Sequence, residues 1–223
     1  FEQVFLTPAF FKSAENKNLL ADLKTKAEII FIEEKLLKET ASTVNPQGVL
    51  AVVKEAIFKG DDFYNKADKI LLLDRIQDPG NMGTMIRTAA AAGFDGIIAL
   101  KGSVDIYNQK VIRATMGGIF SIPIRQKVSR KKFLSEIKNQ AAEFELIAAD
   151  IEAEEYHFDH HYQDKLILMI GNEANGLNDQ LLASASTKIK IPLAKGVESL
   201  NAAVAGSVIA FEILSQSMKN QSK

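Results

Sequence analysis

The chain has 223 residues and a net charge of −1, with charged residues making up 25% of it. This balance excludes a uniformly basic nucleic-acid binder, so any RNA contact must come from local patches. The absence of cysteine excludes disulfides, thiolate zinc sites and a cysteine nucleophile. No apolar run approaches the roughly 18 residues of a membrane span, so we expect no membrane partner, and the lack of cysteine favours a reducing cytoplasm.

The first part of the chain predicts a small α/β unit. Helical spacing over residues 14–27 is followed by a short strand at Glu28–Ile32, a helix at Glu33–Thr40 and a buried strand at Val49–Val53. The chain opens at Phe1 rather than Met, so we expect its true N-terminus to be missing. The polar segment Lys59–Lys66 indicates a boundary, which gives domains 1–66 and 67–223, although a plain surface loop is the alternative.

The remainder of the chain alternates between predicted strands and helices, which indicates an α/β domain with a mostly parallel sheet. Continuous apolar runs are typical of strands that are covered on both faces. The extended segments that we expect are Ile70–Leu73, Gly96–Leu100, Ile119–Ile124, Phe144–Ala149, Leu166–Ile170 and Lys188–Ile191. The helices that we expect are Met82–Ala92, Asn108–Met116, Lys131–Glu143, Asp179–Ala185 and Leu200–Met218.

Three polar, glycine-bearing segments each follow a predicted strand, where ligands bind in open α/β sheets. They are residues 74–87 (DRIQDPGNMGTMIR), 171–177 (GNEANGL) and 191–204 (IPLAKGVESLNAAV). None of them has the glycine order of a dinucleotide or phosphate loop, and no serine nucleophile elbow is present. The sequence therefore predicts a ligand site of another kind.

Each polar residue in these segments has two interpretations. Asn81 can cap the helix that follows it, and the guanidinium of Arg87 suits a phosphate or carboxylate, but a surface arginine or an ion pair explains Arg87 equally well. Glu173 follows an apolar strand, where burial is costly without a partner, and helix capping is the alternative. Ser199 and Asn201 precede the last helix, where simple N-capping is the plainer explanation.

Taken together, the three segments resemble the three signature motifs of the SpoU branch of the SPOUT RNA methyltransferases. DPGNMGTMIRTAAAAG (78–93) and IPLAKGVESLNAAVA (191–205) are close to the family pattern throughout. GNEANGL departs from it at Ala174, where the family usually has glycine. TMGGIFSIP (115–123) also resembles the family, and the resemblance covers residues 68 to 218.

The resemblance implies a trefoil-knot methyltransferase, with a knotted, mostly parallel sheet that has helices on both faces. It also implies S-adenosylmethionine as the cofactor and a homodimer whose subunits share each active site. The positions that it assigns to the cofactor are Leu100, Gly171, Asn172, Ile191 and Leu200. The positions that it assigns to catalysis are Asn81, Arg87, Glu173, Ser199 and Asn201.

Arg87 matches the family position held to act on the ribose hydroxyl. Because arginine stays protonated in proteins, we expect Arg87 to stabilise the developing alkoxide or hold the adjacent phosphate rather than act as a base. The N-terminal part resembles a small RNA-binding domain that precedes many of these enzymes, with its first helix and strand absent. We therefore predict an S-adenosylmethionine-dependent RNA ribose 2′-O-methyltransferase acting on ribosomal RNA. Transfer RNA is the near alternative, and a non-catalytic RNA-binding or assembly factor is the alternative of another class.

Two further clusters stand outside these motifs. The first is a basic run that suits RNA or a solvated loop, and its members are Arg125, Lys127, Arg130, Lys131 and Lys132. The second holds all three histidines, His157, His160 and His161. A metal site is conceivable there, but the polar surroundings favour a surface loop, so we expect no metal.

Overall fold

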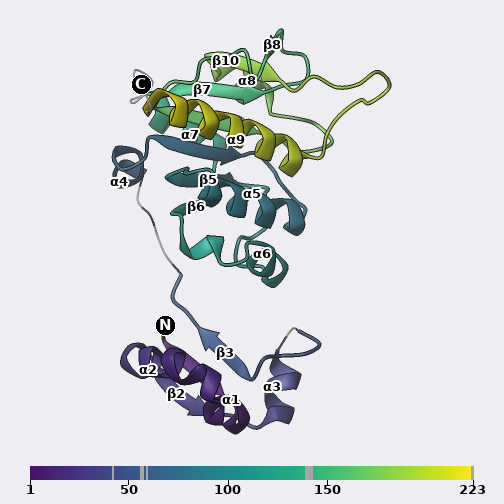
Figure 1. Cartoon of the computed structure of the whole chain (residues 1–223). Helices are drawn as coiled ribbons and strands as arrows, with labels where there is room; N and C mark the ends of the chain where they lie inside the picture. The colour runs from purple at the N-terminus through teal and green to yellow at the C-terminus, as the bar shows by residue number, and fades with distance from the viewer. Residues whose placement is uncertain (42, 56–57, 59, 139–142, 222–223) are drawn as a thin grey trace. The chain divides into compact units, whose positions relative to one another are not determined.

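The computed structural model describes residues 1–41, 43–55, 58, 60–138 and 143–221. The chain divides into two compact units, Phe1–Ile57 and Phe58–Lys223 (Figure 1). This division comes earlier than the boundary expected at residue 66, because helix α4 (Gly60–Asn65) belongs with the second unit. Phe63 and Tyr64 of α4 are 5% and 1% exposed, and both lie in a core cluster of the second unit.

The first unit is a three-stranded sheet covered by short helices. Strand β1 lies in the centre, parallel to β2 and antiparallel to β3. Val4 and Leu6, on one face of β1, are fully buried in a cluster with leucines of α2. The elements are β1 (Gln3–Leu6), α1 (Pro8–Lys12), η1 (Ala14–Asn16), α2 (Lys17–Lys26), β2 (Glu28–Phe31), α3 (Glu34–Thr40) and β3 (Val49–Val52).

The expectation of a buried strand at Val49–Val53 is wrong. The side chains of β3 are half-buried or exposed, because β3 lies at the edge of the described sheet and pairs with β1 alone. A short apolar run predicts that a strand forms, but it does not show whether that strand pairs on one side or on both sides in the sheet.

The second unit contains a seven-stranded sheet of order β6-β5-β4-β9-β7-β10-β8, and every pair in it is parallel. The expected parallel sheet is therefore confirmed, and the carboxyl ends of its strands share one edge. The strands are β4 (Lys69–Leu73), β5 (Gly96–Leu100), β6 (Ile124–Val128), β7 (Glu145–Ala149), β8 (Glu155–Tyr156), β9 (Leu166–Ile170) and β10 (Thr187–Lys190).

Helices cover both faces of this sheet, as expected (Figure 1). Alternate residues of β4 show the division, because Leu71 and Leu73 pack with α5 and α9 while Ile70 and Leu72 pack with α4 and α7. The remaining elements of the unit are α5 (Pro79–Ala91), α6 (Gln109–Ala114), η2 (Gly118–Phe120), α7 (Arg130–Lys138), α8 (Asp179–Ser184) and α9 (Ala202–Gln221). None of the described helices has both the length and the apolar character needed to cross a membrane.

Two predicted elements differ from the structure. The segment Ile119–Ile124, expected to be extended, contains the end of η2 and only the start of β6. Gly117, with φ of 88°, precedes η2 and begins this tight turn. The helix expected at Lys131–Glu143 begins at Arg130 and is described to Lys138, and residues 139–142 lie outside the described part of the chain.

Candidate active site

Helix α5 begins at the carboxyl end of the sheet, just after β4. Asp78 is its N-cap, and the Asp78 carboxylate accepts a hydrogen bond of 2.7 Å from the backbone N–H of Asn81. The expectation that Asn81 caps this helix is therefore wrong, because Asp78 and Pro79 start the helix one turn earlier than predicted. The side chain of Asn81 is left available for contacts outside the helix.

Asn81 joins residues from all three motifs. Its side-chain amide donates to Oε1 of Glu173, and its Oδ1 accepts a hydrogen bond of 2.9 Å from Nδ2 of Asn201. Asn201 also caps α9, because its Oδ1 accepts from the backbone N–H groups of Ala203 and Val204 at 2.9 and 3.2 Å. Capping and site formation are thus compatible roles for Asn201, and three of the five expected catalytic residues form one hydrogen-bonded cluster.

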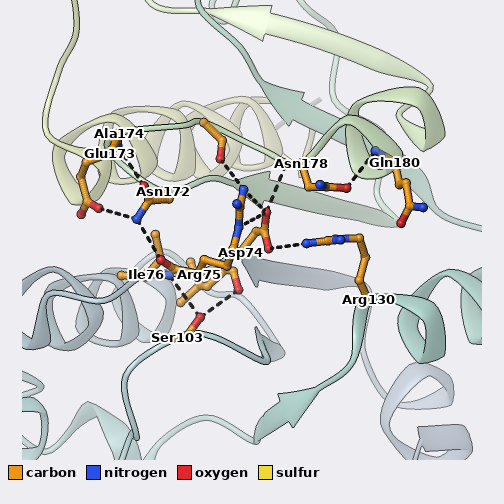
Figure 2. Close-up of polar contacts among 12 residues, drawn as sticks. Asp74, Arg75, Ile76, Ser103, Arg130, Asn172, Glu173, Ala174, Asn178 and Gln180 are labelled. Carbon is orange, nitrogen blue, oxygen red and sulfur yellow. Dashed lines mark hydrogen bonds and ion pairs between the residues drawn. The ribbon is translucent and has the colours of Figure 1, made fainter.

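The loop Gly171–Leu177 follows β9 and carries Glu173 (Figure 2). Asn172 holds this loop, since its Nδ2 donates to the carbonyl of Arg75 at 3.0 Å and its Oδ1 accepts from Ala174 N at 2.9 Å. Nδ2 of Asn172 also lies 3.4 Å from Oε2 of Glu173, so amide donors face both oxygens of that carboxylate. A Cβ at Gly171 would lie 2.2 Å from backbone atoms of Gly176 and Leu177, so only glycine fits there.

A cavity of about 390 Å³ opens at the carboxyl ends of β7, β9 and β10. Its size lies in the range of small-molecule sites. It is lined by the whole loop Gly171–Leu177, by Asp150, and by apolar side chains that include Ile170, Ile189, Ile191 and Leu200. Apolar side chains with a few polar groups suit a flat heterocycle joined to a polar chain, so the lining fits S-adenosylmethionine.

Most of the expected cofactor residues lie at this cavity. Gly171, Asn172, Ile191 and Leu200 line it, as do Glu173 and Ser199 of the expected catalytic set. Leu100 does not line it, and is 2% exposed within the core cluster that contains Phe133 of α7.

Sequence reasoning missed Asp150, which lines the cavity directly after β7. The signal was present, because Asp150 follows a predicted strand, and ligands bind beyond the carboxyl ends of such strands.

Arg87 lies apart from the cavity of its own chain. It is exposed on α5, about 9 Å along the helix axis from Asn81 at the usual rise of an α-helix, and it is not among the cavity-lining residues. Among the described residues, none forms a hydrogen bond or ion pair with its side chain. Gly118 of η2 packs beside it, since a Cβ at Gly118 would lie 3.3 Å from the Cα of Arg87.

The histidine segment is more ordered than the surface loop expected from the sequence. His157 is 8% exposed, and the ring of His160 contacts Glu145 at 2.7 Å and Glu155 at 3.0 Å. These contacts tie the segment to β7 and β8, which sequence spacing does not reveal. Within the described ranges, no group of three or more possible ligand side chains is arranged to hold a metal ion.

Comparison with known proteins gives one consistent family. The sequence profile of the SpoU rRNA Methylase family matches residues 68–211. The chain is 29% identical over 215 residues to the 23S rRNA (guanosine(2553)-2′-O)-methyltransferase RlmP of Bacillus subtilis, covering 95% of this chain and 84% of that protein. It is 34% identical over 204 residues to an uncharacterized tRNA/rRNA methyltransferase of Synechocystis, covering 89% and 72% of the two chains.

Solved structures agree with the fold. The crystal structure of the SpoU methyltransferase AviRb from Streptomyces viridochromogenes, in complex with the cofactor AdoMet, matches with a TM-score of 0.87 and 27% identity, over 97% of this chain and 83% of that chain. The AdoMet-bound rRNA methyltransferase from Sinorhizobium meliloti matches with a TM-score of 0.82 and 27% identity, over 95% and 78% of the two chains. These likenesses confirm the fold class predicted from the motifs.

Proposed function

The chain belongs to the SpoU rRNA methylase family, and from this premise we propose that it methylates the ribose 2′-hydroxyl of one nucleotide in ribosomal RNA. It is an RNA methyltransferase that uses S-adenosylmethionine. The observation that carries the proposal is the cluster of Asn81, Glu173 and Asn201, which joins the three motifs and whose Glu173 lines a cavity suited to the cofactor. The printed activity of the Bacillus subtilis relative, a 2′-O-methyltransferase of 23S rRNA, supports the ribosomal target.

The cavity residues bind and orient the cofactor. Ile191 and Leu200 line the cavity and would hold the flat apolar part of the cofactor, and the loop after β9 would supply backbone polar groups. Asp150 is placed to accept hydrogen bonds from the hydroxyl groups of a ribose. When bound, S-adenosylmethionine supplies an electrophilic methyl group, so the remaining task of the protein is to bring the nucleotide hydroxyl in line with it.

The polar residues act on the nucleotide rather than on the cofactor. Asn81, Glu173 and Ser199 orient the ribose at the mouth of the cavity, and the hydrogen bonds between Asn81 and its neighbours fix the direction of its amide. The ribose oxygen would gain negative charge as its proton passes to solvent water, and it would take the methyl group as the S–CH3 bond of the donor breaks and leaves a neutral thioether. The protonated guanidinium of Arg87 stabilises that charge or holds the adjacent phosphate.

Arg87 reaches a bound ribose through a homodimer in which the subunits share each site. Its distance from its own cavity supports this arrangement, as does an exposed apolar stripe on α9, which packs on α5. The stripe consists of Val204, Val208 and Phe211, which are 49%, 39% and 47% exposed, at the spacing of one helix face. Met116, two residues before η2, and Phe120, the last residue of η2, are 74% and 75% exposed, and apolar surface of this kind marks interfaces.

A single charged substitution tests this dimer. Phe211→Glu should give a monomer in light scattering and lose methyl transfer, because a buried unpaired carboxylate opposes association. Lys138→Ala, an exposed change on α7, is the matched control. A wild-type protein that is monomeric and fully active would contradict the shared site.

The first unit, Phe1–Ile57, binds the RNA substrate in this proposal, and its α/β order and its resemblance to an RNA-binding domain support that role. The enzyme works in the cytoplasm, consistent with its lack of cysteine. Transfer RNA is the competing substrate, since several relatives carry the broader description tRNA/rRNA methyltransferase.

The decisive experiment offers both substrates at once. Full-length protein is incubated with methyl-labelled S-adenosylmethionine and total RNA from a strain that lacks the gene. Label should enter large ribosomal RNA and survive in alkali-stable dinucleotides, because a 2′-O-methyl group blocks alkaline cleavage of the adjacent linkage. Label in transfer RNA or in a base would contradict the proposal. Tight donor binding without transfer would favour a non-catalytic binding factor.

A further inference from the structure

Arg75, the second residue after β4, has a left-handed backbone with φ of 58°. Residues other than glycine are disfavoured in this region of backbone conformation, so the surrounding structure must hold Arg75 in it. Its side chain also lies over Gly102, where an added Cβ would be 3.1 Å from Cγ of Arg75. The contacts that Arg75 makes with neighbouring residues explain why its backbone is held in this strained conformation.

Those contacts join Arg75 to a buried carboxylate and to the cofactor loop. Nε and Nη2 of Arg75 lie 3.2 and 3.0 Å from Oδ2 of Asp74, and Nη2 also donates to the carbonyl of Gly176 at 3.2 Å. Asp74 is 0% exposed, and the same Oδ2 accepts from the backbone N–H of Asn178 at 3.1 Å. Arg130 faces the other oxygen of Asp74, at 3.9 Å, so positive groups face both sides of the buried carboxylate (Figure 2).

The backbone of Arg75 supplies a third attachment. Its carbonyl accepts the hydrogen bond from Nδ2 of Asn172, at the start of the loop. Asp74 and Arg75 therefore contact the loop segment at its beginning through Asn172 and at its end through Asn178 (Figure 2), and Arg75 also contacts the carbonyl of Gly176. Every residue from Gly171 to Leu177 lines the cavity, whereas Asp74 and Arg75 do not.

We propose that Asp74 and Arg75 are positioning residues that clamp the loop Gly171–Leu177 in the shape that binds S-adenosylmethionine. The left-handed Arg75 places its carbonyl at Asn172 and its guanidinium at Gly176, where these two loop residues also exchange backbone hydrogen bonds of 3.1 and 2.8 Å. This inference rests on the proposed function only in taking the cavity as the cofactor site. It gives the strained residue a role in cofactor affinity rather than in the transfer step.

Two substitutions of Arg75 distinguish an effect on the shape of the cofactor loop from an effect on the stability of the fold. Arg75→Gly removes the guanidinium and leaves the buried Asp74 with Arg130 as its charged partner, but it adopts the left-handed backbone without strain, so its Tm should fall less than that of a variant that keeps a Cβ. Arg75→Ala removes the same group and keeps the strain, so its Tm should fall. Both variants should bind S-adenosylmethionine about tenfold more weakly in calorimetry, the factor expected for a lost hydrogen bond of a charged group.

Transfer kinetics supply the second readout. With either variant, KM for S-adenosylmethionine should rise about tenfold, while kcat at saturating cofactor stays near that of wild type. Lys138→Ala, which removes an exposed positive charge far from the loop, should change neither value. Wild-type affinity in Arg75→Gly, or affinity that follows Tm across the two variants, would overturn the clamp.

The direct binding measurement keeps this proposal separate from the proposed function. If wild-type protein binds the cofactor but methylates no RNA, the substrate assignment fails while the calorimetric comparison of Arg75→Gly with wild type still decides the clamp. If Arg75→Gly lowers kcat and leaves affinity unchanged, the clamp fails and the assignment of the enzyme stands.

Discussion

Arg125 and Arg87 both lie in segments whose sequence suits RNA, but their surroundings differ. Arg125 is 5% exposed and forms two hydrogen bonds of 3.0 Å with Glu136, and its guanidinium lies over the rings of Phe63 and Tyr64. Arg87 is exposed, and no described residue is bonded to its side chain. The fold therefore leaves Arg87 available to a substrate, whereas Arg125 is held by a local acid.

The same holds along the rest of the basic run. Lys127 is paired with Asp105 at 2.8 Å, Lys132 lies 3.9 Å from Glu136, and Arg130 faces Asp74. Asp105 precedes α6, Glu136 lies in α7 and Asp74 follows β4, so acids of the same domain face these three basic residues, while the side chains of Lys127 and Lys132 are still 68% and 63% exposed. Arg125 therefore has a structural role, whereas Lys127, Lys131 and Lys132 are exposed and remain candidates for RNA contact.

The largest expected effect is that of Arg87→Ala on methyl transfer. The rate at saturating RNA and cofactor should fall by about 10² to 10³, as when a group that stabilises a developing oxyanion is removed. Calorimetric affinity for S-adenosylmethionine should not change, because Arg87 does not line the cavity. Arg87→Lys, which keeps the charge but not the forked geometry, should recover only part of the rate. Undiminished transfer by Arg87→Ala would remove the contrast with Arg125.

Arg125→Ala should have the opposite signature, with a loss of stability and no specific loss of chemistry. Removing one member of a buried pair leaves its partner uncompensated, which costs about 3 kcal/mol of unfolding free energy. Urea unfolding followed by circular dichroism measures this, and the folded fraction should keep wild-type cofactor affinity. The double variant Arg125→Met with Glu136→Leu should recover much of the loss. If Arg125→Ala unfolds like wild type but fails to bind RNA, the basic run is an RNA patch after all.

Features of the fold that are set by residues close together in the sequence can be predicted from the sequence. The strands β4, β5 and β9 are continuous apolar runs, and their positions and parallel arrangement follow from periodicity and alternation. The gathering of the three motifs at one edge follows from the rule for open α/β sheets. Residues of the candidate site are therefore largely predictable as a set.

Features decided by contacts between distant residues are not predictable in this way. Asp78 and Asn81 are both good N-caps, and only the fold shows that Asp78 takes that role and leaves Asn81 to Glu173 and Asn201. The burial of Arg125 depends on Glu136 one helix later, together with the aromatic residues of α4. The left-handed Arg75 gives no local signal, because glycine usually marks such positions.

The exposed ion pair of Asp105 and Lys127 should contribute less to the free energy of unfolding than the buried pair of Arg125 and Glu136. The hydrogen bond from Lys127, followed by that from the backbone of Tyr107, holds the pKa of Asp105 below its usual value. A folded-state pKa below the unfolded one means that the stabilisation is present above the unfolded pKa of about 3.9 and is lost as pH falls through the folded pKa.

Asp105→Asn keeps an oxygen for the Tyr107 N–H but loses the ion pair, so it should cost less than about 1 kcal/mol at pH 7. Its unfolding free energy should converge with that of wild type as the pH falls below the folded-state pKa of Asp105, and also at high salt. A cost at pH 7 as large as that of Arg125→Ala would show that exposure does not separate the two pairs.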